Sequence, residues 1–417
     1  MKSKSIFFNQ FFDELNKEAI DYCIMNGYED YPEEIGSDID IVVNSYIEFE
    51  KILEQLSKKL NFTIIQKMEH KHKVANFFVA KEYDGVSSIL SLDIYEHYVV
   101  KERLLFDSKY FLEDKESLKN FYIPNSKKEF LYYFVKKIIK QDVEENIDQL
   151  IKLYQEDANF ELYFKDNSKH IHEAFSNKDR NYFLTNKKLL RSDLFNSTQP
   201  LTHLKVFEAL RVVKRVLNPI GFEISFLGPD GSGKSTIIEE LKTRELPFRR
   251  VDYFHLKPRL FGAKGDGKPV VDPHAKEAYK GLLSYLKLFH FMIDYIIGFF
   301  VKVLPLKMRS SLVIFDRYYD DILVDPKRFR YGGNLGFAKF MRHFIPKPNL
   351  YFILTSNAEV IYERKQEVSF EELERQIEVY ESLVDNKRYI KIDVNRDVKE
   401  IANEIENIIY GKLDERY

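Results

Sequence analysis

The stretch Gly228-Pro-Asp-Gly-Ser-Gly-Lys-Ser235 constrains the fold of this chain more than any other. The apolar run Phe222–Leu227 before it is typical of a buried strand, and Thr236–Lys242 after it has the apolar spacing of a helix start. A strand, a glycine-rich loop and a helix are the context that the pattern G-x-x-x-x-G-K-[ST] requires. Glycines let the backbone N–H groups point inward at a helix N-terminus, so the sequence predicts a cage for phosphate oxygens.

The side chains of the loop have complementary predicted roles. Lys234 is expected to reach the β- and γ-phosphates of ATP, and Ser235 is expected to hold Mg²⁺. The residues predicted to contact the nucleotide are Gly228, Gly231, Ser232, Gly233, Lys234, Ser235 and Thr236. The alternative is a chance glycine-rich turn before a structural helix, which the complete motif in its full context disfavours.

Length and composition set broad limits on the rest of the chain. At 417 residues it is too long for one typical core, so two or three domains are expected. Lys+Arg 64 against Asp+Glu 66 predicts no general affinity for nucleic acid or anionic membranes, although a local basic patch stays open.

Its single cysteine, Cys23, cannot form an internal disulfide, which suits a reducing compartment. The N-terminal residues lack the long apolar core of a signal peptide, and no apolar run reaches membrane-spanning length without charges. The expectation is therefore a cytoplasmic protein without a transmembrane segment.

Residues 1–125 are predicted to form a small α/β domain. Helices are expected over residues 5–20 and Tyr46–Leu60, from apolar residues at helical spacing. Predicted strands are Tyr22–Met25, Asp38–Val43, Phe62–Lys67, His72–Lys81 and Ser87–His97. Glu82-Tyr-Asp-Gly85 suits a hairpin turn between the last two.

Three carboxylates in this domain are candidate metal ligands. Asp38 and Asp40 are two residues apart on one predicted strand, so both side chains point to the same face. Asp93 lies on a later predicted strand between apolar neighbours. Converging carboxylates on a sheet face can hold two Mg²⁺ ions for a triphosphate. A solvated strand edge is the alternative, but carboxylates beside Ile41-Val-Val43 are costly to bury without a cation.

This pattern resembles the nucleotidyltransferase superfamily, in which a glycine element precedes a D-x-D pair and a third acidic residue on a neighbouring strand. Met25-Asn-Gly27-Tyr28 corresponds to the glycine element, and Tyr28 stands where the family has a small residue. The resemblance covers residues 20–97 and implies a metal-dependent nucleotidyl-transfer site.

Residues 126–219 are predicted to be helical. The expected helices are 130–140, 146–155, 161–167, 170–175, 181–190 and 201–217. The region is either the helical companion of a nucleotidyltransferase domain or a spacer. Its lysines are expected on a solvated face: Lys136, Lys137, Lys140, Lys187 and Lys188.

Residues 220–417 are predicted to form an α/β domain with a parallel sheet flanked by helices. Further strands are expected at Arg250–Phe254, Leu312–Asp316, Asn349–Leu354 and Tyr389–Asp393, with helices at Ala278–Leu304, Ala358–Lys365, Phe370–Val384 and Val398–Tyr410. The apolar helix Ala278–Leu304 either walls an acceptor pocket or contacts a lipid-linked acceptor. His255, Lys257 and Arg259 open an irregular segment that either meets an anionic substrate or is a solvated loop.

Asp316 and Arg317 follow a short apolar strand and are therefore expected at the carboxyl edge of the sheet, where such folds bind ligands. Asp316 can hold Mg²⁺ or its water, and Arg317 can clamp an acceptor phosphate with two hydrogen bonds. A purely structural ion pair is the alternative.

Residues 222–410 resemble a thymidylate kinase. The resemblance rests on the acidic phosphate loop with Asp230, on Asp316-Arg317-Tyr318, on the Pro348-Asn-Leu strand, and on an arginine-bearing lid after Ala358. It implies that Asp230 contacts an acceptor sugar and that a lid arginine, with Arg364 the first candidate, acts in catalysis. The Arg-Glu-Pro-Gly segment of the family is absent, so the chain looks more like the thymidylate-kinase-like proteins among bacterial surface-polysaccharide enzymes.

The sequence therefore predicts a kinase that uses ATP and Mg²⁺, with a phosphorylated or sugar-containing acceptor and a second, nucleotidyl-transfer activity as a further hypothesis. Two alternatives stay open: a dTMP kinase with an inert N-terminal domain, and a nucleotide-gated binding or regulatory protein. Partners are expected to be nucleotides and a small-molecule or glycan acceptor, not nucleic acid. A lipid-linked acceptor and a homodimer are left open.

Overall fold

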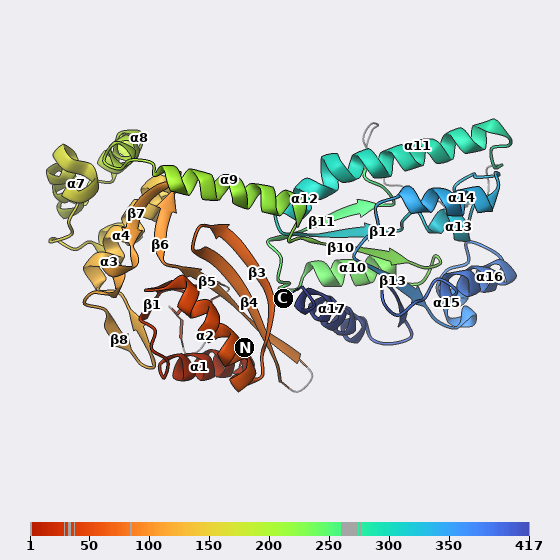
Figure 1. The fold of residues 1–417 in the computed structure, drawn as a ribbon, viewed down its shortest axis with the longest axis horizontal. Helices are drawn as coiled ribbons and strands as arrows, with labels where there is room; N and C mark the ends of the chain where they lie inside the picture. The colour runs from red at the N-terminus through yellow and green to blue at the C-terminus, as the bar shows by residue number, and fades with distance from the viewer. Residues whose placement is uncertain are drawn as a thin grey trace. The chain divides into compact units, whose positions relative to one another are not determined.

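The computed structural model describes residues 2–28, 30, 31, 35, 36, 38–83, 86–259, 274 and 277–416. The chain is of the mixed α/β class, as the sequence predicts (Figure 1). Backbone contacts divide it into two compact units, residues 1–212 with 413–417 and residues 213–412. The finer division into three domains stays a prediction.

The first unit is built around a five-stranded sheet. Its strands are β1 (Tyr22–Asn26), β2 (Asp38–Val43), β3 (Thr63–Lys71), β4 (Val74–Tyr83) and β5 (Val86–Tyr95). They lie in the order β1-β2-β5-β4-β3, and every neighbouring pair is antiparallel except β2 with β5. The register of β4 with β5 confirms the predicted hairpin, whose turn residues 84 and 85 lie outside the described residues.

Two small hairpins and a series of helices complete this unit. The hairpins pair β6 (His97–Val100) with β7 (Arg103–Asp107) and β8 (Glu116–Leu118) with β9 (Phe121–Ile123). The helices are α1 (Lys2–Leu15), α2 (Tyr46–Leu60), α3 (Ser108–Leu112), α4 (Ser126–Lys140), α5 (Val143–Leu153), α6 (Glu161–Phe164), the 3-10 helix η1 (Lys165–Asn167), α7 (Ser168–Ser176), α8 (Arg180–Asn196) and α9 (Thr202–Leu217).

The two faces of this sheet pack against different helices. Ile39, Ile41 and Val43 on β2 lie in a core with the phenylalanines of α1 and with Phe49 of α2. Val42 lies instead in a second core, which the aromatic residues of α4 to α8 dominate. Because side chains alternate along a strand, Asp38 and Asp40 belong to the same face as Val42. That face looks toward α4.

The second unit is an all-parallel sheet with helices on both sides (Figure 1). Its strands are β10 (Phe222–Leu227), β11 (Arg250–His255), β12 (Ser311–Asp316), β13 (Leu350–Thr355) and β14 (Tyr389–Asp393). They lie in the order β11-β12-β10-β13-β14, and every pair is parallel. Every residue of β10, β12 and β13 is buried, as expected for a parallel sheet covered on both faces.

The helices of the second unit include those predicted near 236–242, 278–304, 358–365, 370–384 and 398–410, and short helices between residues 304 and 344 that were not predicted. They are α10 (Lys234–Lys242), α11 (Leu282–Gly298), the π-helical turn η2 (Phe299–Val303), α12 (Leu304–Met308), α13 (Asp321–Val324), α14 (Leu335–Met341), the 3-10 helix η3 (Arg342–Phe344), α15 (Ala358–Arg364), α16 (Phe370–Glu381) and α17 (Val398–Asp414). Pro305 accounts for the π-helical turn. It has no N–H to donate to the carbonyl of Val301, so the α-helical hydrogen-bond pattern is interrupted there.

The run Leu282–Met308 is, by length and composition alone, apolar enough to cross a membrane, and about a third of its most apolar window is buried. Its inner side belongs to the core of the second unit. Leu288, Phe291 and Tyr295 pack with the residues of β12 and β13, and Asp294 forms a buried ion pair with Lys257 at 2.5 Å. One side of this helix is therefore part of the core of the second unit, and its role as the wall of an acceptor pocket stays a prediction.

A second buried ion pair ties α12 to the centre of the sheet. The Nζ atom of Lys307 lies 3.3 Å from Oε2 of Glu223, and the side chains are 9% and 0% exposed. The same ammonium donates to Oδ1 of Asn349 at 3.3 Å. Such a pair stabilises little by itself, but either partner alone is a buried, uncompensated charge.

Replacing Lys307 with Met should lower the free energy of unfolding by about 3–5 kcal/mol, because Glu223 is left buried without its countercharge. The double variant Lys307→Met/Glu223→Leu should recover most of the loss, because an apolar pair of similar volume packs without charge. Urea denaturation followed by circular dichroism measures both. A single variant as stable as the wild type would contradict this account of the pair.

Candidate functional site

The glycine-rich loop joins β10 to α10 and curls through three glycines with positive φ. Gly228, Gly231 and Gly233 have φ of +145°, +87° and +81°, which L side chains rarely adopt. Gly233 is the N-cap of α10, so the loop ends on a helix N-terminus, where backbone N–H groups favour anions. Ser235 and Thr236 are exposed in the first turn of that helix. The loop thus has the glycine turns and the helix N-terminus that the predicted phosphate cage needs, and phosphate binding stays a prediction.

Lys234 is turned inward over this loop and is 7% exposed. Its ammonium donates to the carbonyl oxygens of Gly228 and Pro229 at 2.8 and 2.7 Å, and to Oγ of Ser232 at 3.3 Å. Burial, aided by the guanidinium of Arg317, lowers the pKa of Lys234 to about 8. The side chain is thus still charged at neutral pH, and its cost of burial is offset by loop carbonyls.

Asp316 ends β12 at the edge of the sheet beside this loop. Tyr253 donates to its Oδ2 atom at 3.2 Å, and Nδ1 of His255 lies 3.7 Å from the same oxygen. Its Oδ1 atom is buried and has no hydrogen-bond partner among the described residues. Burial alone would raise the pKa of Asp316, but His255, Lys234 and Arg317 outweigh it and hold that pKa below its usual value. An ionised carboxylate with a free buried oxygen is a suitable ligand for Mg²⁺.

The carboxylate of Asp230 joins several segments of the second unit. It accepts hydrogen bonds from the guanidinium groups of Arg317 and Arg328. Arg317, whose φ is +73°, also donates to Oδ2 of Asp321 at 2.9 Å, and Arg328 lies 3.5 Å from Oε2 of Glu367. Burial would raise the pKa of Asp230, but Arg317 and the other partners outweigh it and hold that pKa well below its usual range.

Asp230, Arg317, Asp321, Arg328 and Glu367 form a charged cluster. The sequence alone does not identify Arg328 or Glu367 as part of it. The available signal was the segment 325–333, where charged and aromatic residues crowd after the Asp-Arg pair. Arg364, the predicted lid arginine, is exposed, and its guanidinium donates to the carbonyl of Val394 at 3.3 Å. The structure therefore places Arg328 rather than Arg364 at Asp230, and a catalytic role for Arg364 stays a prediction.

The basic residues after β11 take different positions. His255 lies beside Asp316, whereas Lys257 is committed to its buried pair with Asp294. The carbonyl of Arg259 accepts a hydrogen bond from Lys302. Of the three, His255 is the one that the described contacts bring to a predicted site residue. Residues 260–273 of the predicted irregular segment lie outside the described residues.

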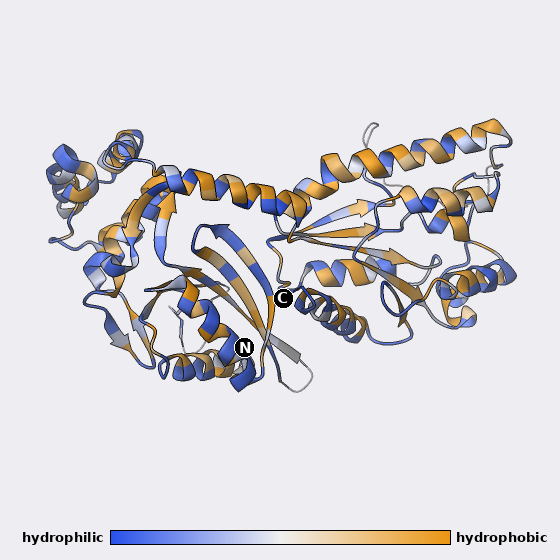
Figure 2. Cartoon of the chain, in the orientation of Figure 1, coloured by the Kyte–Doolittle hydropathy of each residue, from blue (hydrophilic) through white to orange (hydrophobic). Residues whose placement is uncertain are grey.

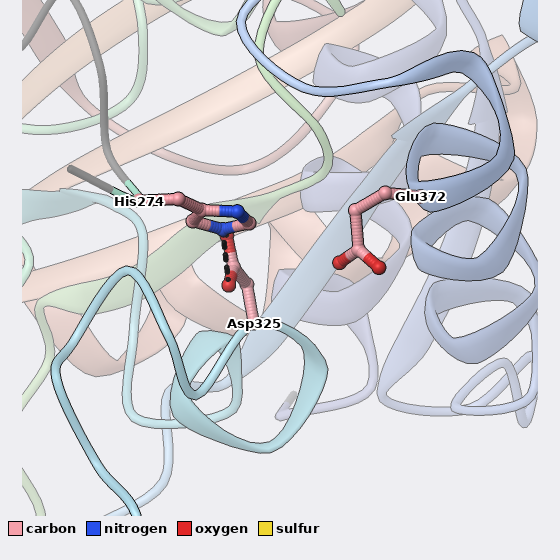
Figure 3. A group of neighbouring side chains, drawn as sticks. All are labelled: His274, Asp325 and Glu372. Carbon is pink, nitrogen blue, oxygen red and sulfur yellow. Dashed lines mark hydrogen bonds and ion pairs between the residues drawn. The ribbon is translucent and has the colours of Figure 1, made fainter. Parts of the chain in front are cut away.

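His274, Asp325 and Glu372 form a further group of side chains next to this cluster (Figure 3). The Nε2 atom of His274 lies 2.9 and 3.0 Å from the two oxygens of Asp325, and one ligand atom from each of the three residues lies within 4.8 Å of the others. Arg375 binds both oxygens of Glu372, and the backbone N–H of Arg328 donates to Asp325. The group therefore already forms a hydrogen-bonded network, which positions the segment that carries Arg328.

In the first unit, β2 and β5 bring the three predicted metal ligands to one face. Asp40 is the register partner of Asp93, and Asp38 lies two residues before Asp40. Ser91 donates to Oδ1 of Asp38 at 2.7 Å and accepts from Asn76 at 2.8 Å. Burial is the main cause that raises the pKa of Asp40 and of Asp93. Across the described ranges these carboxylates do not form a set of three ligand atoms within 4.8 Å of one another, so they lie side by side without converging on one point.

Lys136 corrects an expectation from the sequence. It was predicted on a solvated face, yet its Nζ atom lies 3.4 Å from Oδ2 of Asp40 and its side chain is 24% exposed. The reason is that α4 covers the acidic face of the sheet. Burial alone would lower the pKa of Lys136, but Tyr132 and Asp40 outweigh it and raise that pKa. An internal cation thus partly neutralises the acidic face.

The glycine element of this unit adopts a turn that requires glycine. Gly27 has φ +94°, and a Cβ atom there would lie 2.5 Å from the carbonyl oxygen of Asp38. Tyr28 packs against Phe121 and donates to Oε1 of Glu129 at 3.3 Å. The backbone before β2 is therefore held close to Asp38, as the predicted site needs.

No protein-family model matches this chain. No curated protein matches it with statistical significance either.

Two glycines of the loop should differ in their tolerance of a side chain. Gly233→Ala should cost about 1–2 kcal/mol of stability, because alanine is strained at positive φ although nothing lies within 4 Å of its Cβ. Gly228→Ala should cost more, because its Cβ would also lie 2.4 Å from the carbonyl oxygen of Leu354. Urea unfolding of the two variants measures the difference, and equal costs would contradict the described loop.

Proposed function

We propose that the chain is an ATP- and Mg²⁺-dependent phosphotransferase, with residues 220–417 as a thymidylate-kinase-like domain. The observation that carries this proposal is the cluster at the edge of the parallel sheet. There the ammonium of Lys234, in the complete phosphate loop, interacts with the charges of Asp230, Asp316 and Arg317. Arg317 also donates a hydrogen bond to Asp230. In open parallel sheets this edge is where ligands bind.

Each residue of the cluster has a step that its position suits. Loop N–H groups and Lys234 bind the β- and γ-phosphates, and Ser235 with Asp316 would hold Mg²⁺. The metal supplies neutralisation of the phosphate charge when it is bound. The free buried oxygen of Asp316 fits that role. Phosphoryl transfer needs mainly positioning and charge neutralisation, so no covalent intermediate on the protein is required.

The acceptor side of the proposal rests on two arginines. Arg317 and Arg328 both donate to Asp230, and Arg317 also donates to Asp321, so an anionic acceptor would exchange with these carboxylates for the two guanidinium groups. An acceptor that carries a phosphate satisfies them, and the carboxylate of Asp230 can accept from a sugar hydroxyl. We therefore propose a phosphorylated or sugar-containing acceptor, such as a nucleotide or a glycan precursor of a surface polysaccharide, in the cytoplasm.

Release of ADP that depends on an acceptor tests this function. The full chain, with ATP and Mg²⁺, is offered nucleoside monophosphates, sugars and sugar phosphates. Turnover with one class should fall by about 10²-fold or more in Lys234→Ala, because the ammonium that neutralises charge on the transferring phosphoryl group is removed. Lys399→Ala, which changes an exposed lysine on α17, is the matched control and should keep full activity.

The result also separates the alternatives. Turnover with dTMP alone would make the chain a dTMP kinase. Tight ATP binding without turnover for any member of the panel would contradict the proposed acceptor classes and favour a regulatory protein. If the wild-type chain does not bind ATP, the assignment of Gly228–Ser235 as a phosphate loop is wrong.

We propose nucleotidyl transfer as a second activity, located on the acidic face of β2 and β5. The register of Asp40 with Asp93 supports it, because it aligns carboxylates from two strands on one face. Burial raises the pKa of both carboxyl groups because a buried negative charge is costly. Divalent cations that bind the carboxylates would offset this cost. Lys136 competes for the same carboxylate oxygen of Asp40.

Mn²⁺ binding to the Lys234→Ala chain, measured by calorimetry, tests this site apart from the kinase site. Asp38→Asn should weaken binding at least about tenfold, because a ligand is removed. Lys136→Met should strengthen it, because a competing ammonium is removed. Lys137→Met, next in sequence and paired with Asp142, is the matched control and should change nothing. Unchanged Mn²⁺ binding and nucleotidyl transfer in Asp38→Asn would remove the proposal.

A further inference from the structure

The outer side of α11 and of the π-helical turn after it presents a long row of bulky apolar side chains to solvent. Its members, defined here as the α11 face, are Leu282, Leu283, Leu286, Phe289, Ile297, Phe300 and Val301, which are 45–73% exposed. Neighbours in this set are one or three residues apart, except for a step of eight from Phe289 to Ile297, which the half-buried Ile293 divides. The set therefore follows one side of the helix for about 25 Å. Figure 2 shows the hydrophobic colouring along most of α11. Monomeric soluble proteins rarely expose a contiguous apolar surface of this length.

A second apolar row lies beside the first. Phe337, Phe340 and Phe344 on α14 and η3 are 40–55% exposed, and neighbouring rings contact each other with centroids 6.5 and 5.4 Å apart. Tyr285 of α11 connects the rows, because its ring centroid lies 5.3 Å from that of Phe337 and its hydroxyl accepts from the N–H of Asn334. The exposed apolar surface therefore extends over two neighbouring helices.

The inner side of α11 limits what this surface can do. Leu288, Phe291 and Tyr295 are buried in the core, and the ion pair of Asp294 with Lys257 lies beneath the same helix. Leaving that core to cross a bilayer would carry a charged pair into hydrocarbon, which is costly. The helix is thus suited to lie on a membrane with its outer side buried, not to span it.

The two segments that carry the apolar rows are rich in basic residues. The segments 280–309 and 335–349 contain eight Lys or Arg residues and one acidic residue, the buried Asp294. Four of the basic residues are exposed: Lys280, Arg309, Lys339 and Lys347. The nearest acidic residue before the first segment is Glu277. The chain as a whole is almost neutral, so these two segments, called here the basic border, carry a local excess of positive charge.

We propose that the α11 face and the adjoining phenylalanines dock on the surface of a bilayer that contains anionic lipids. Apolar side chains would enter the interface, and the basic border would meet the lipid phosphates. A second copy of the chain suits this surface less well. In a symmetric dimer the same patch meets itself, so the basic borders of the two copies would face each other without an exposed carboxylate on these segments. The docking does not depend on the proposed kinase activity.

Sedimentation of the full chain with lipid vesicles tests the proposal. We expect binding to phosphatidylcholine vesicles that contain phosphatidylglycerol, weaker binding to phosphatidylcholine alone, and weakening by salt. Leu286→Glu/Phe289→Glu should reduce the partition coefficient by roughly tenfold or more, because two apolar contacts become charges. Ile47→Glu is the matched control, since Ile47 is an equally exposed apolar residue on a helix of the other unit, at 58%.

The basic border is tested separately. Lys339→Gln/Lys347→Gln should weaken binding to the anionic vesicles by about tenfold and leave binding to phosphatidylcholine alone unchanged. Equal urea midpoints for all variants would show that each one is folded. Three results would overturn the proposal: no sedimentation of the wild type with anionic vesicles, an equal loss in Ile47→Glu, or a dimer by light scattering that Leu286→Glu/Phe289→Glu dissociates while vesicles bind neither form.

Discussion

The carboxylate of Asp230 is the interaction on which the cluster in the second unit depends. It accepts from Arg317, which follows β12 with a left-handed backbone, and from Arg328 on the segment after α13. Arg328 in turn lies near Glu367, between α15 and α16. Because the carboxylate is half-buried and ionised, removing either cation would leave part of its charge uncompensated. The phosphate loop, the sheet edge and the helical segments are thereby held in one arrangement.

In both units, carboxylates near a sheet are paired with a cationic side chain of the same unit. Each holds half-buried carboxylates on or beside a sheet, and each supplies an internal cation: Arg317 and Arg328 for Asp230, and Lys136 for Asp40. Both sets of carboxylates are therefore tolerated before any ligand arrives. A ligand must exchange with these pairs, so its binding free energy is a difference between two sets of charge interactions.

The sequence was informative where the signal is local. The strand, loop and helix around Gly228–Ser235, the placement of Asp316 at a strand end, and the common face of Asp38 and Asp40 all follow from spacing over a few residues. Arg328 and Lys136 could not be found in this way, because they meet their partners across 98 and 96 residues of chain. Which side chain reaches a site from a distant helix depends on packing that no short pattern contains.

The parallel pairing of β2 with β5 has a consequence for the order of folding. Asp38 and Ser91 are 53 residues apart, and α2, β3 and β4 lie between their strands. Antiparallel neighbours such as β4 and β5 can pair through a short turn, but a parallel pair forms only after a long loop has closed. The acidic face is therefore completed late, when β5 joins β2. During synthesis, before β5 has left the ribosome, the chain can form helices and hairpins but not the acidic face.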